Sequence, residues 1–262
     1  MTAVRIAAAT SVLGQPFRKA LHIAAAAGVD GVQIDARDEL RPADMTGTAL
    51  RQVRKMLEEA NLRVAGAALA TRRGLLAPQD FERRIEAVTA AIGLASKLGG
   101  GVLVTNLGTL PAEDDARRSE VLDALTLLGA AGQRAGVVLA IAAADIEPDE
   151  LATLLAELPE GTLGLDFNPG DLIAHGCTPR EWLDRLGPHV VHFTAADAVP
   201  GIGGATAIQV ELGRGVADVH ELVARLLEQY GYRGWATAGR RGSASPEQEL
   251  HDAAAFIRSC GH

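Results

Sequence analysis

The sequence is poor in cysteine and in aromatic side chains. Its two cysteines, Cys177 and Cys260, lie far apart and outside any CxxC pattern. This excludes a disulfide framework and a zinc knuckle, and it fits the reducing cytoplasm, where we expect the protein to be. Aromatic residues form 3% of the chain. Because aromatic faces are the usual platforms for sugar rings, binding of neutral polysaccharides is disfavoured.

An excess of positive charge and long apolar runs are also missing. Lys and Arg total 25 against 33 Asp and Glu, a formal net charge of -8. We therefore expect no nucleic-acid partner. No stretch approaches the roughly 18 consecutive apolar residues of a membrane helix, and no basic segment precedes the apolar run at 4–9. We expect neither a membrane partner nor a signal peptide.

Short apolar runs alternate regularly with longer amphipathic segments. The runs, typical of buried parallel strands, span residues 4–9, 31–35, 62–68, 101–106, 136–142, 162–167, 189–194 and 234–238. Helical periodicity covers 16–27, 48–60, 78–98, 115–135, 148–158, 179–186, 217–229 and 246–257. Eight such repeats predict one α/β domain over residues 1–262, a (β/α)8 TIM barrel, with a doubly wound open sheet as the main alternative. The glycine-rich stretch 201–205 is predicted to be a long loop after the seventh strand.

Barrel enzymes place their working groups where the strands end, and polar residues occur at these places here. The candidates are Gln33, Asp35, Arg72, Arg73, Asn106, Asp166, Asn168, Asp171, His192, Thr194, Asp197, Arg240 and Arg241. The fifth strand ends instead in three alanines, 142–144, which offer no charge or hydrogen-bonding side chain. Since neighbouring strand residues alternate faces, Asp166 is predicted to point away from the barrel axis.

Five segments add a recognisable order of motifs. They read GVDGVQI at 28–34, LGLDFNPGDLI at 163–173, VVHFTAAD at 190–197, ELGRGVAD at 211–218 and YGYRGWATAG at 230–239. In this order, and over nearly the whole chain, they resemble the xylose isomerase-like TIM barrels, also called sugar phosphate isomerases/epimerases. The resemblance implies a protein of carbohydrate metabolism.

The resemblance also implies a divalent metal, Mn, Mg, Zn or Co, held by Glu, Asp, His and Glu from strands five to eight. Those places fall on Ala142, Asn168, Thr194 and Gly239, and a small shift of the alignment would put Asp166 in the strand-six place. None of the four retains its ligand. We therefore expect a divergent member with a degenerate metal site and no bound cofactor, whose metal-dependent activity is lost.

Each remaining candidate has a functional and a structural interpretation. His192 is either a general base in the barrel mouth or a satisfied core histidine. Arg72, Arg73 and Arg240 either bind an anion or lie on a solvated surface.

The uncharged and acidic candidates are divided in the same way. Gln33, Asn106, Asn168 and Thr194 either bind ligand hydroxyls or hold loop backbone. Asp197 either contacts ligand or caps a loop, and the Gly213-Arg-Gly215 turn either holds a phosphate or is a simple turn.

Three functions remain open. The first is binding of a small sugar, sugar acid or sugar phosphate, the second a metal-independent isomerase or lyase using His192, and the third a non-catalytic partner of an active homologue. A homo-oligomer is compatible with each. The nuclease branch of the same superfamily is disfavoured, because the chain supplies neither a zinc cluster nor a basic surface.

Overall fold

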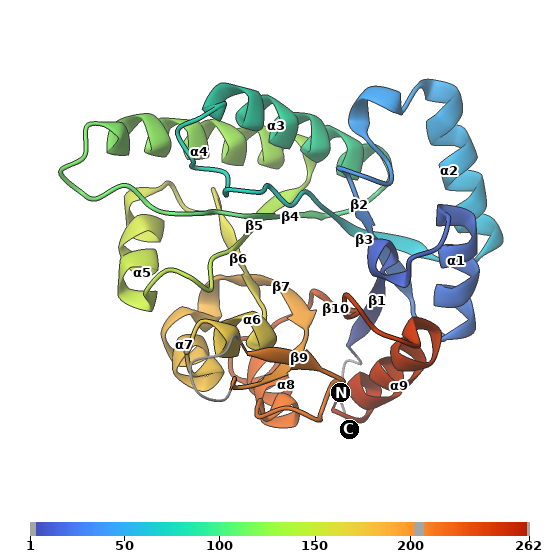
Figure 1. The fold of residues 1–262 in the computed structure, drawn as a ribbon. Helices are drawn as coiled ribbons and strands as arrows, with labels where there is room; N and C mark the ends of the chain where they lie inside the picture. The colour runs from blue at the N-terminus through green and yellow to red at the C-terminus, as the bar shows by residue number, and fades with distance from the viewer. Residues whose placement is uncertain (1–3, 202–206, 261–262) are drawn as a thin grey trace.

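The computed structural model describes residues 4–201 and 207–260, and eight parallel strands in it close into a barrel ringed by helices (Figure 1). Around the barrel the strands follow the order β1-β10-β7-β6-β5-β4-β3-β2. They are β1 (Arg5–Ala9), β2 (Gly31–Asp35), β3 (Arg63–Ala68), β4 (Val102–Asn106), β5 (Val138–Ala142), β6 (Gly164–Phe167), β7 (Val190–Ala195) and β10 (Trp235–Ala238). The predicted (β/α)8 barrel is confirmed, and the open sheet is wrong.

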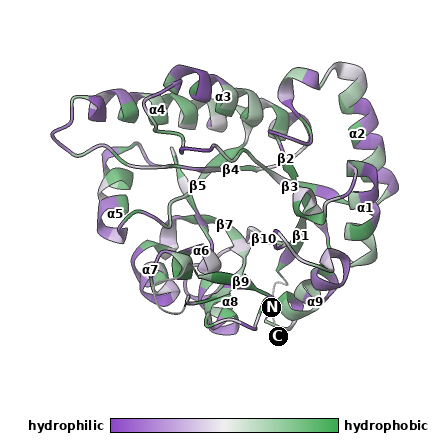
Figure 2. Cartoon of the chain, in the orientation of Figure 1, coloured by the Kyte–Doolittle hydropathy of each residue, from purple (hydrophilic) through white to green (hydrophobic). Residues whose placement is uncertain are grey.

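Helices follow the barrel strands and pack on their outer surface. They are α1 (Phe17–Ala26), α2 (Gly47–Glu59), α3 (Phe81–Lys97), α4 (Arg117–Ala135), α5 (Pro148–Glu157), α6 (Pro169–Ala174), α7 (Pro179–Leu186), α8 (Val219–Glu228) and α9 (Pro246–Ser259). Figure 2 shows hydrophilic and hydrophobic residues interspersed along them, as expected of amphipathic helices between a barrel and solvent. None of these helices is both long and apolar enough to cross a membrane.

Two elements near the barrel mouth depart from the predicted repeat. After β7 the chain forms an antiparallel hairpin of β8 (Asp197–Val199) and β9 (Ile208–Val210) where a loop is predicted. Most of the glycine-rich stretch 201–205 lies outside the described residues. The short helix α6 is also unpredicted, because six residues are too few to show helical periodicity.

The register of the strands decides which side chains face the barrel interior. Residues that pair across neighbouring strands point to the same side of a sheet. Ala7 pairs with Thr237, which pairs with Thr194, and Asp166 pairs with His192. Polar side chains therefore face the interior at the C-terminal mouth, whereas Ala7, Ala65 and Trp235 form a separate apolar cluster deeper in the barrel.

Candidate functional site at the barrel mouth

Five polar side chains from four strands form one hydrogen-bonded network inside the barrel. They are Gln33 of β2, Asp166 of β6, His192 and Thr194 of β7, and Thr237 of β10. The Thr194 hydroxyl donates to the Asp166 carboxylate, whose two oxygens lie 2.9 and 3.0 Å from it. The network therefore joins strands on opposite sides of the barrel.

His192 is at the centre of this network and is fully partnered. Its Nδ1 lies 2.8 Å from Asp166 Oδ1, and since a carboxylate only accepts, Nδ1 carries the proton. Nε2 of the neutral ring then accepts from the Thr237 hydroxyl at 2.9 Å and from the Gln33 amide nitrogen at 3.3 Å. His192 is 1% exposed and Asp166 6%, whereas Gln33 and Thr194 are partly exposed. Gln33 and Thr194 thus form the solvent-facing side of the network.

The strand pairing is irregular beside two members of the network. The register shifts between Val32 and Gln33 where β2 meets β3, and between Leu165 and Asp166 where β6 meets β7. Such bulges re-aim side chains and are common beside functional sites. Alternation nevertheless holds within β6, where Leu165 and Phe167 belong to the main core and Phe167 stacks on Trp182 of α7 with ring centroids 5.4 Å apart. Asp166 between them therefore faces the interior, and the predicted outward orientation is wrong.

A second polar group lies above β6. Asn168 caps α6, accepting from the Asp171 backbone N–H at 3.1 Å and donating to its carboxylate at 2.8 Å. Gln209 of β9 donates to the same carboxylate at 3.2 Å. Burial raises the pKa of Asp171, and the negative charge of Asp166 raises it further, while His175 and Gln209 act in the opposite direction. The Asp171 carboxyl is therefore a weaker acid than an exposed aspartate.

Two of the other predicted ligand-binding residues are held by partners inside the protein. The Asn106 carboxamide accepts from the Thr71 backbone N–H at 2.7 Å and from its hydroxyl at 3.1 Å, and it donates to the Thr71 carbonyl at 2.9 Å. The Arg240 guanidinium makes two 2.7 Å bonds to the Glu249 carboxylate. In this structure Asn106 orders the loop after β3, and Arg240 ties β10 to α9.

Of the two interpretations of Asp197, the structure shows the one in which it caps a loop. Its carboxylate, 1% exposed, accepts from the backbone N–H groups of Gly213, Gly215, Ala217 and Ala198 at 2.8–3.1 Å. A Cβ on Gly215 would lie 2.0 Å from Asp197 Oδ1, so glycine is required for this approach. The N–H groups of Gly213 and Gly215 donate to Asp197 and that of Arg214 donates to the Glu211 carbonyl, so none of the three is directed at a ligand phosphate.

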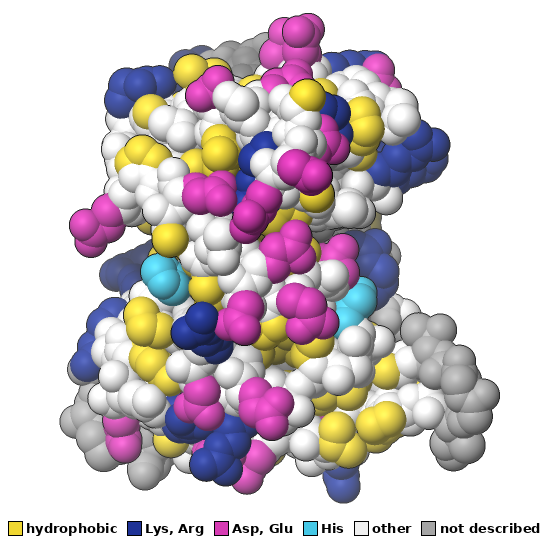
Figure 3. Space-filling model, turned by 90° about the vertical axis from the view of Figure 1, so that its left-hand side faces the viewer, with side chains coloured by type: hydrophobic (Ala, Val, Ile, Leu, Met, Phe, Trp, Pro, Cys, Tyr) yellow, Lys and Arg dark blue, Asp and Glu magenta, His cyan; other side chains and the backbone are white. Residues whose placement is uncertain are grey.

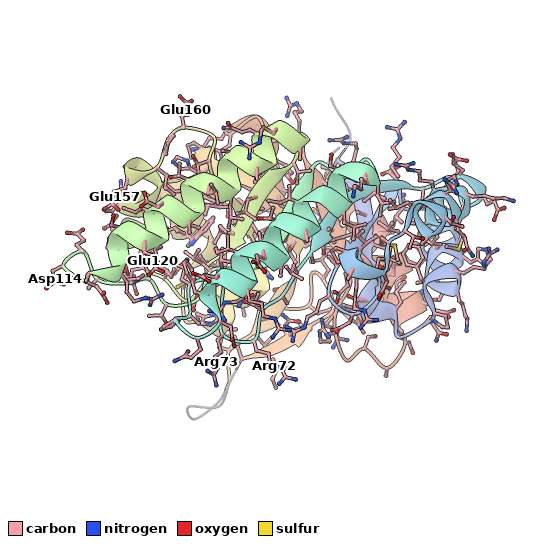
Figure 4. All side chains as sticks on the ribbon, turned by 90° about the horizontal axis from the view of Figure 1, so that it is seen from above. Arg72, Arg73, Asp114, Glu120, Glu157 and Glu160 are labelled. Atoms are coloured by element: carbon pink, nitrogen blue, oxygen red, sulfur yellow. The ribbon has the colours of Figure 1, made fainter. Side chains whose placement is uncertain are left out.

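Arg72 and Arg73 lie apart from the interior network. Both are exposed on the loop after β3, and Figure 4 shows them projecting from one side of the ribbon, away from α3 and α4. Arg73 approaches the Gln79 carboxamide at 3.5 Å. Neither arginine forms an ion pair with a described residue.

The residues at the family's metal positions do not fit a metal ion. Ala142 at the end of β5 has no ligand atom, Thr194 is engaged with Asp166, and Gly239 lies just beyond β10 with φ 137. A Cβ on Gly239 would meet the Val12 side chain at 2.6 Å, so a glutamate cannot occupy this backbone position unstrained. Across residues 4–201 and 207–260 no three His, Cys, Asp or Glu side chains converge as a metal site.

Two polar groups near the strand ends were not predicted from the sequence. Thr237 is the single polar residue of β10, and its position in an otherwise apolar strand is a signal that could have revealed it. Glu39 accepts from the Thr10 hydroxyl at 2.6 Å and from the Asp35 backbone N–H at 3.2 Å, while its other oxygen is buried without a partner. Burial, more than any other cause, raises the pKa of Glu39. Glu39 lies four residues beyond the predicted strand end, and no local sequence pattern indicates that it is a buried polar residue.

The comparisons with known proteins agree with the barrel fold. A family model described as xylose isomerase-like TIM barrel matches residues 21–260. A xylose isomerase domain protein from Planctomyces limnophilus superposes with a TM-score of 0.87 at 20% identity, covering 99% of this chain and 98% of that one. A xylose isomerase-like TIM barrel protein from Mycobacterium smegmatis in complex with magnesium gives 0.80 at 15% identity, with 99% and 96% covered. The 3-keto-D-glucoside 4-epimerase of E. coli gives 0.76 at 17%, with 98% and 100% covered. No curated protein matches the sequence.

Proposed function

Because the chain belongs to the xylose isomerase-like TIM barrel family, we propose that it binds a small carbohydrate at the barrel mouth by hydrogen bonds in place of the family's metal cage. One observation carries the proposal: a connected polar network occupies the interior where strands six, seven and eight end. Polar groups that converge at the C-terminal end of a barrel are the usual setting of its ligand site. The expected ligand is a sugar, sugar acid or sugar phosphate.

The solvent-facing members of the network suit the hydroxyl groups of a sugar. The side-chain amide nitrogen of Gln33 is directed at His192. The oxygen of the same side-chain amide has no partner in the described part of the chain. The Thr194 hydroxyl donates to Asp166 and keeps lone pairs for a ligand donor. Because the buried His192 and Asp166 hold both side chains, the hydrogen-bonding atoms are oriented before a ligand arrives.

Structural neighbours that act on sugars support the carbohydrate class. They include the E. coli 3-keto-D-glucoside 4-epimerase and a D-allulose 3-epimerase from Methylomonas. The Mycobacterium neighbour was crystallised with magnesium. The side chains at Ala142, Asn168, Thr194 and Gly239 argue against the same arrangement here, so the proposed binding uses amide, hydroxyl and carboxyl groups alone.

The proposal is tested by calorimetric titration of neutral ketoses, sugar acids and sugar phosphates into the protein. For any ligand that binds, Thr194→Val and Gln33→Ala are each expected to weaken binding by roughly five- to tenfold, since each removes about one hydrogen bond. Thr89→Val, an exposed threonine of α3, is the matched control and should leave affinity unchanged. Equal affinities in all three variants would place the ligand elsewhere.

A second candidate is metal-independent isomerisation, and the bond between His192 and Asp166 favours it. Asp166 fixes the tautomer in which Nε2 lacks the proton, the arrangement that a histidine base requires. Nε2 would take a proton from the hydroxyl-bearing carbon beside a substrate carbonyl and return it, on the same face, to the carbonyl carbon, while the hydroxyl proton passes to the carbonyl oxygen. For this, the ligand must displace the Gln33 amide, which makes the longer of the two contacts to Nε2.

Exchange of deuterium from solvent into a bound ketose separates the two candidates. Isomerisation requires exchange in the parent protein and its loss in His192→Gln, while binding of the ketose persists. A parent protein that binds the ketose without exchanging any carbon-bound hydrogen restricts the function to binding. The third possibility, a non-catalytic partner of an active homologue, stays a prediction.

A further inference from the structure

A cleft lined by arginines opens on the loops that follow β2 and β3. Its walls come from the segment 69–73 and from the first turns of α3, and its volume, open solvent included, is about 1120 Å³. The arginines that line it are Arg37, Arg72, Arg73, Arg83 and Arg84. Five guanidinium groups at one cleft are unexpected on a chain whose net charge is -8.

Most of this positive charge is uncompensated. Arg37, Arg72, Arg73 and Arg83 form no ion pair with any residue in 4–201 or 207–260. Asp80 is the one carboxylate in the lining, and it pairs with none of them. Arginines held close together without carboxylates repel one another, and a bound oxyanion would relieve that repulsion.

The backbone that carries these arginines is held firmly. Asn106 makes three hydrogen bonds to Thr71, just before Arg72, and its carbonyl accepts from the Leu75 backbone N–H at 2.9 Å. The Arg37 guanidinium donates to the Ala70 carbonyl at 2.7 Å, so the loops after β2 and β3 are joined. The bonds of Asn106 thus serve to position the arginine cleft.

The loop after β2 connects the cleft to the polar network along the chain. Arg37 of the cleft is four residues beyond Gln33 of the network, so their Cα atoms lie at most about 14 Å apart even in extended chain. On the opposite side of the barrel, Asp166 and Asp171 provide negative charge near β6. A ligand with one anionic end and a neutral polyhydroxyl end would be oriented by this difference in charge.

We infer that the arginine cleft binds the oxyanion group of the ligand, a phosphoryl or carboxylate group, so that the natural ligand is an anionic sugar derivative. This inference rests on the proposed carbohydrate site and specifies its substrate class. Arg72 and Arg73 are the principal contacts, since both are exposed and their guanidinium groups present paired donors that match two oxyanion oxygens.

The inference is tested by equilibrium dialysis with radiolabelled inorganic phosphate and, in a second arm, with D-gluconate. The variant Arg72→Gln/Arg73→Gln is compared with Arg51→Gln/Arg134→Gln, which makes the same change in net charge at exposed arginines outside the cleft. The parent and the control should bind one anion per chain, and the cleft variant should bind it at least about tenfold more weakly. Preference for phosphate or for gluconate identifies the source of the oxyanion.

Two results would overturn the inference. One is absence of anion binding in the parent protein, and the other is an equal loss in the control variant. A neutral ketose, D-fructose, titrated into the same proteins separates this failure from that of the carbohydrate site. If anion binding fails in either of these ways, ketose binding that depends on Thr194 and Gln33 would leave the proposed function standing without the anion site.

Discussion

Among single residues, Glu39 is the clearest case of a side chain whose surroundings oppose its charge. It lies between the loops after β1 and β2, where one carboxylate oxygen accepts from Thr10 and Asp35 and the other has no partner. Burial raises its pKa above the ordinary value of 4.5. The folded protein therefore holds this proton more tightly than the unfolded chain does, and the ionised form reduces folded stability.

Replacing Glu39 by Gln should make the stability less dependent on pH. The raised pKa favours the folded state below the ordinary glutamate range, and this contribution is lost as the pH rises through the folded value. Glu39→Gln, which stays neutral, is expected to be more stable than the parent at pH 7–8, with the difference vanishing toward pH 4. Urea unfolding at both pH values measures it, and Glu58→Gln, at an exposed position on α2, controls for loss of charge. A difference that does not change with pH would contradict the assignment.

At the scale of elements, Asp197 organises the segment between β8 and α8. Four backbone N–H groups from residues far apart in this segment converge on one buried carboxylate. Charge-assisted hydrogen bonds of this kind are about twice as strong as neutral ones. Asp197 thus holds the turn at 213–217 beside β8, together with the bond from the Val216 N–H to the Ala198 carbonyl.

The variant Asp197→Ala should therefore destabilise the protein by at least about 3 kcal/mol, because four N–H groups lose a charged acceptor and some remain buried. The comparison is Asp218→Ala, which removes a single exposed cap bond at the start of α8 and should cost about 1 kcal/mol. Chemical denaturation of both variants measures the difference. Similar losses of stability in the two variants would mean that water replaces the carboxylate as acceptor with little change in the free energy of unfolding.

For the whole molecule, charge is distributed unevenly over the surface. Figure 3 shows Asp and Glu side chains gathered through the middle of one face. Figure 4 shows Asp114, Glu120 and Glu157 near the N-terminal end of α4 and Glu160 farther along this helix, all away from Arg72 and Arg73. An anionic ligand is therefore attracted by the arginine cleft and repelled by the net charge of -8, and salt weakens both interactions.

The absence of a metal site among the residues that the structure describes gives a prediction for the whole protein. Neither EDTA nor Mn, Mg, Zn or Co ions should shift the melting temperature, because a ligand stabilises a fold only in proportion to its affinity for it. Thermal unfolding with and without each ion measures this. A saturable rise in melting temperature that disappears in His192→Gln would reveal a metal site at the polar network and contradict the prediction.

Much of the architecture could be predicted from local sequence. The barrel strands and most helices lie where apolar runs and helical periodicity indicate them, since burial on both faces or on one face leaves a local pattern. The substitutions at the metal positions, such as Ala142 and Gly239, are equally visible in the sequence. The eight repeats favoured closure into a barrel over the open sheet, and the structure confirms the barrel.

Tertiary structure alone decided how the polar residues are partnered. Asp166 faces inward because its neighbour Phe167 packs outward on Trp182 of α7, and a four-residue strand that is buried throughout does not reveal this orientation in its sequence. Gln33 and His192 are 159 residues apart in sequence yet share a hydrogen bond across the barrel. Arg37 and Arg83 join Arg72 and Arg73 at one cleft only because β2, β3 and α3 are neighbours. Local sequence determines which side chains are present at the strand ends, whereas long-range packing determines which of them meet, because distances between strands are set by closure of the barrel.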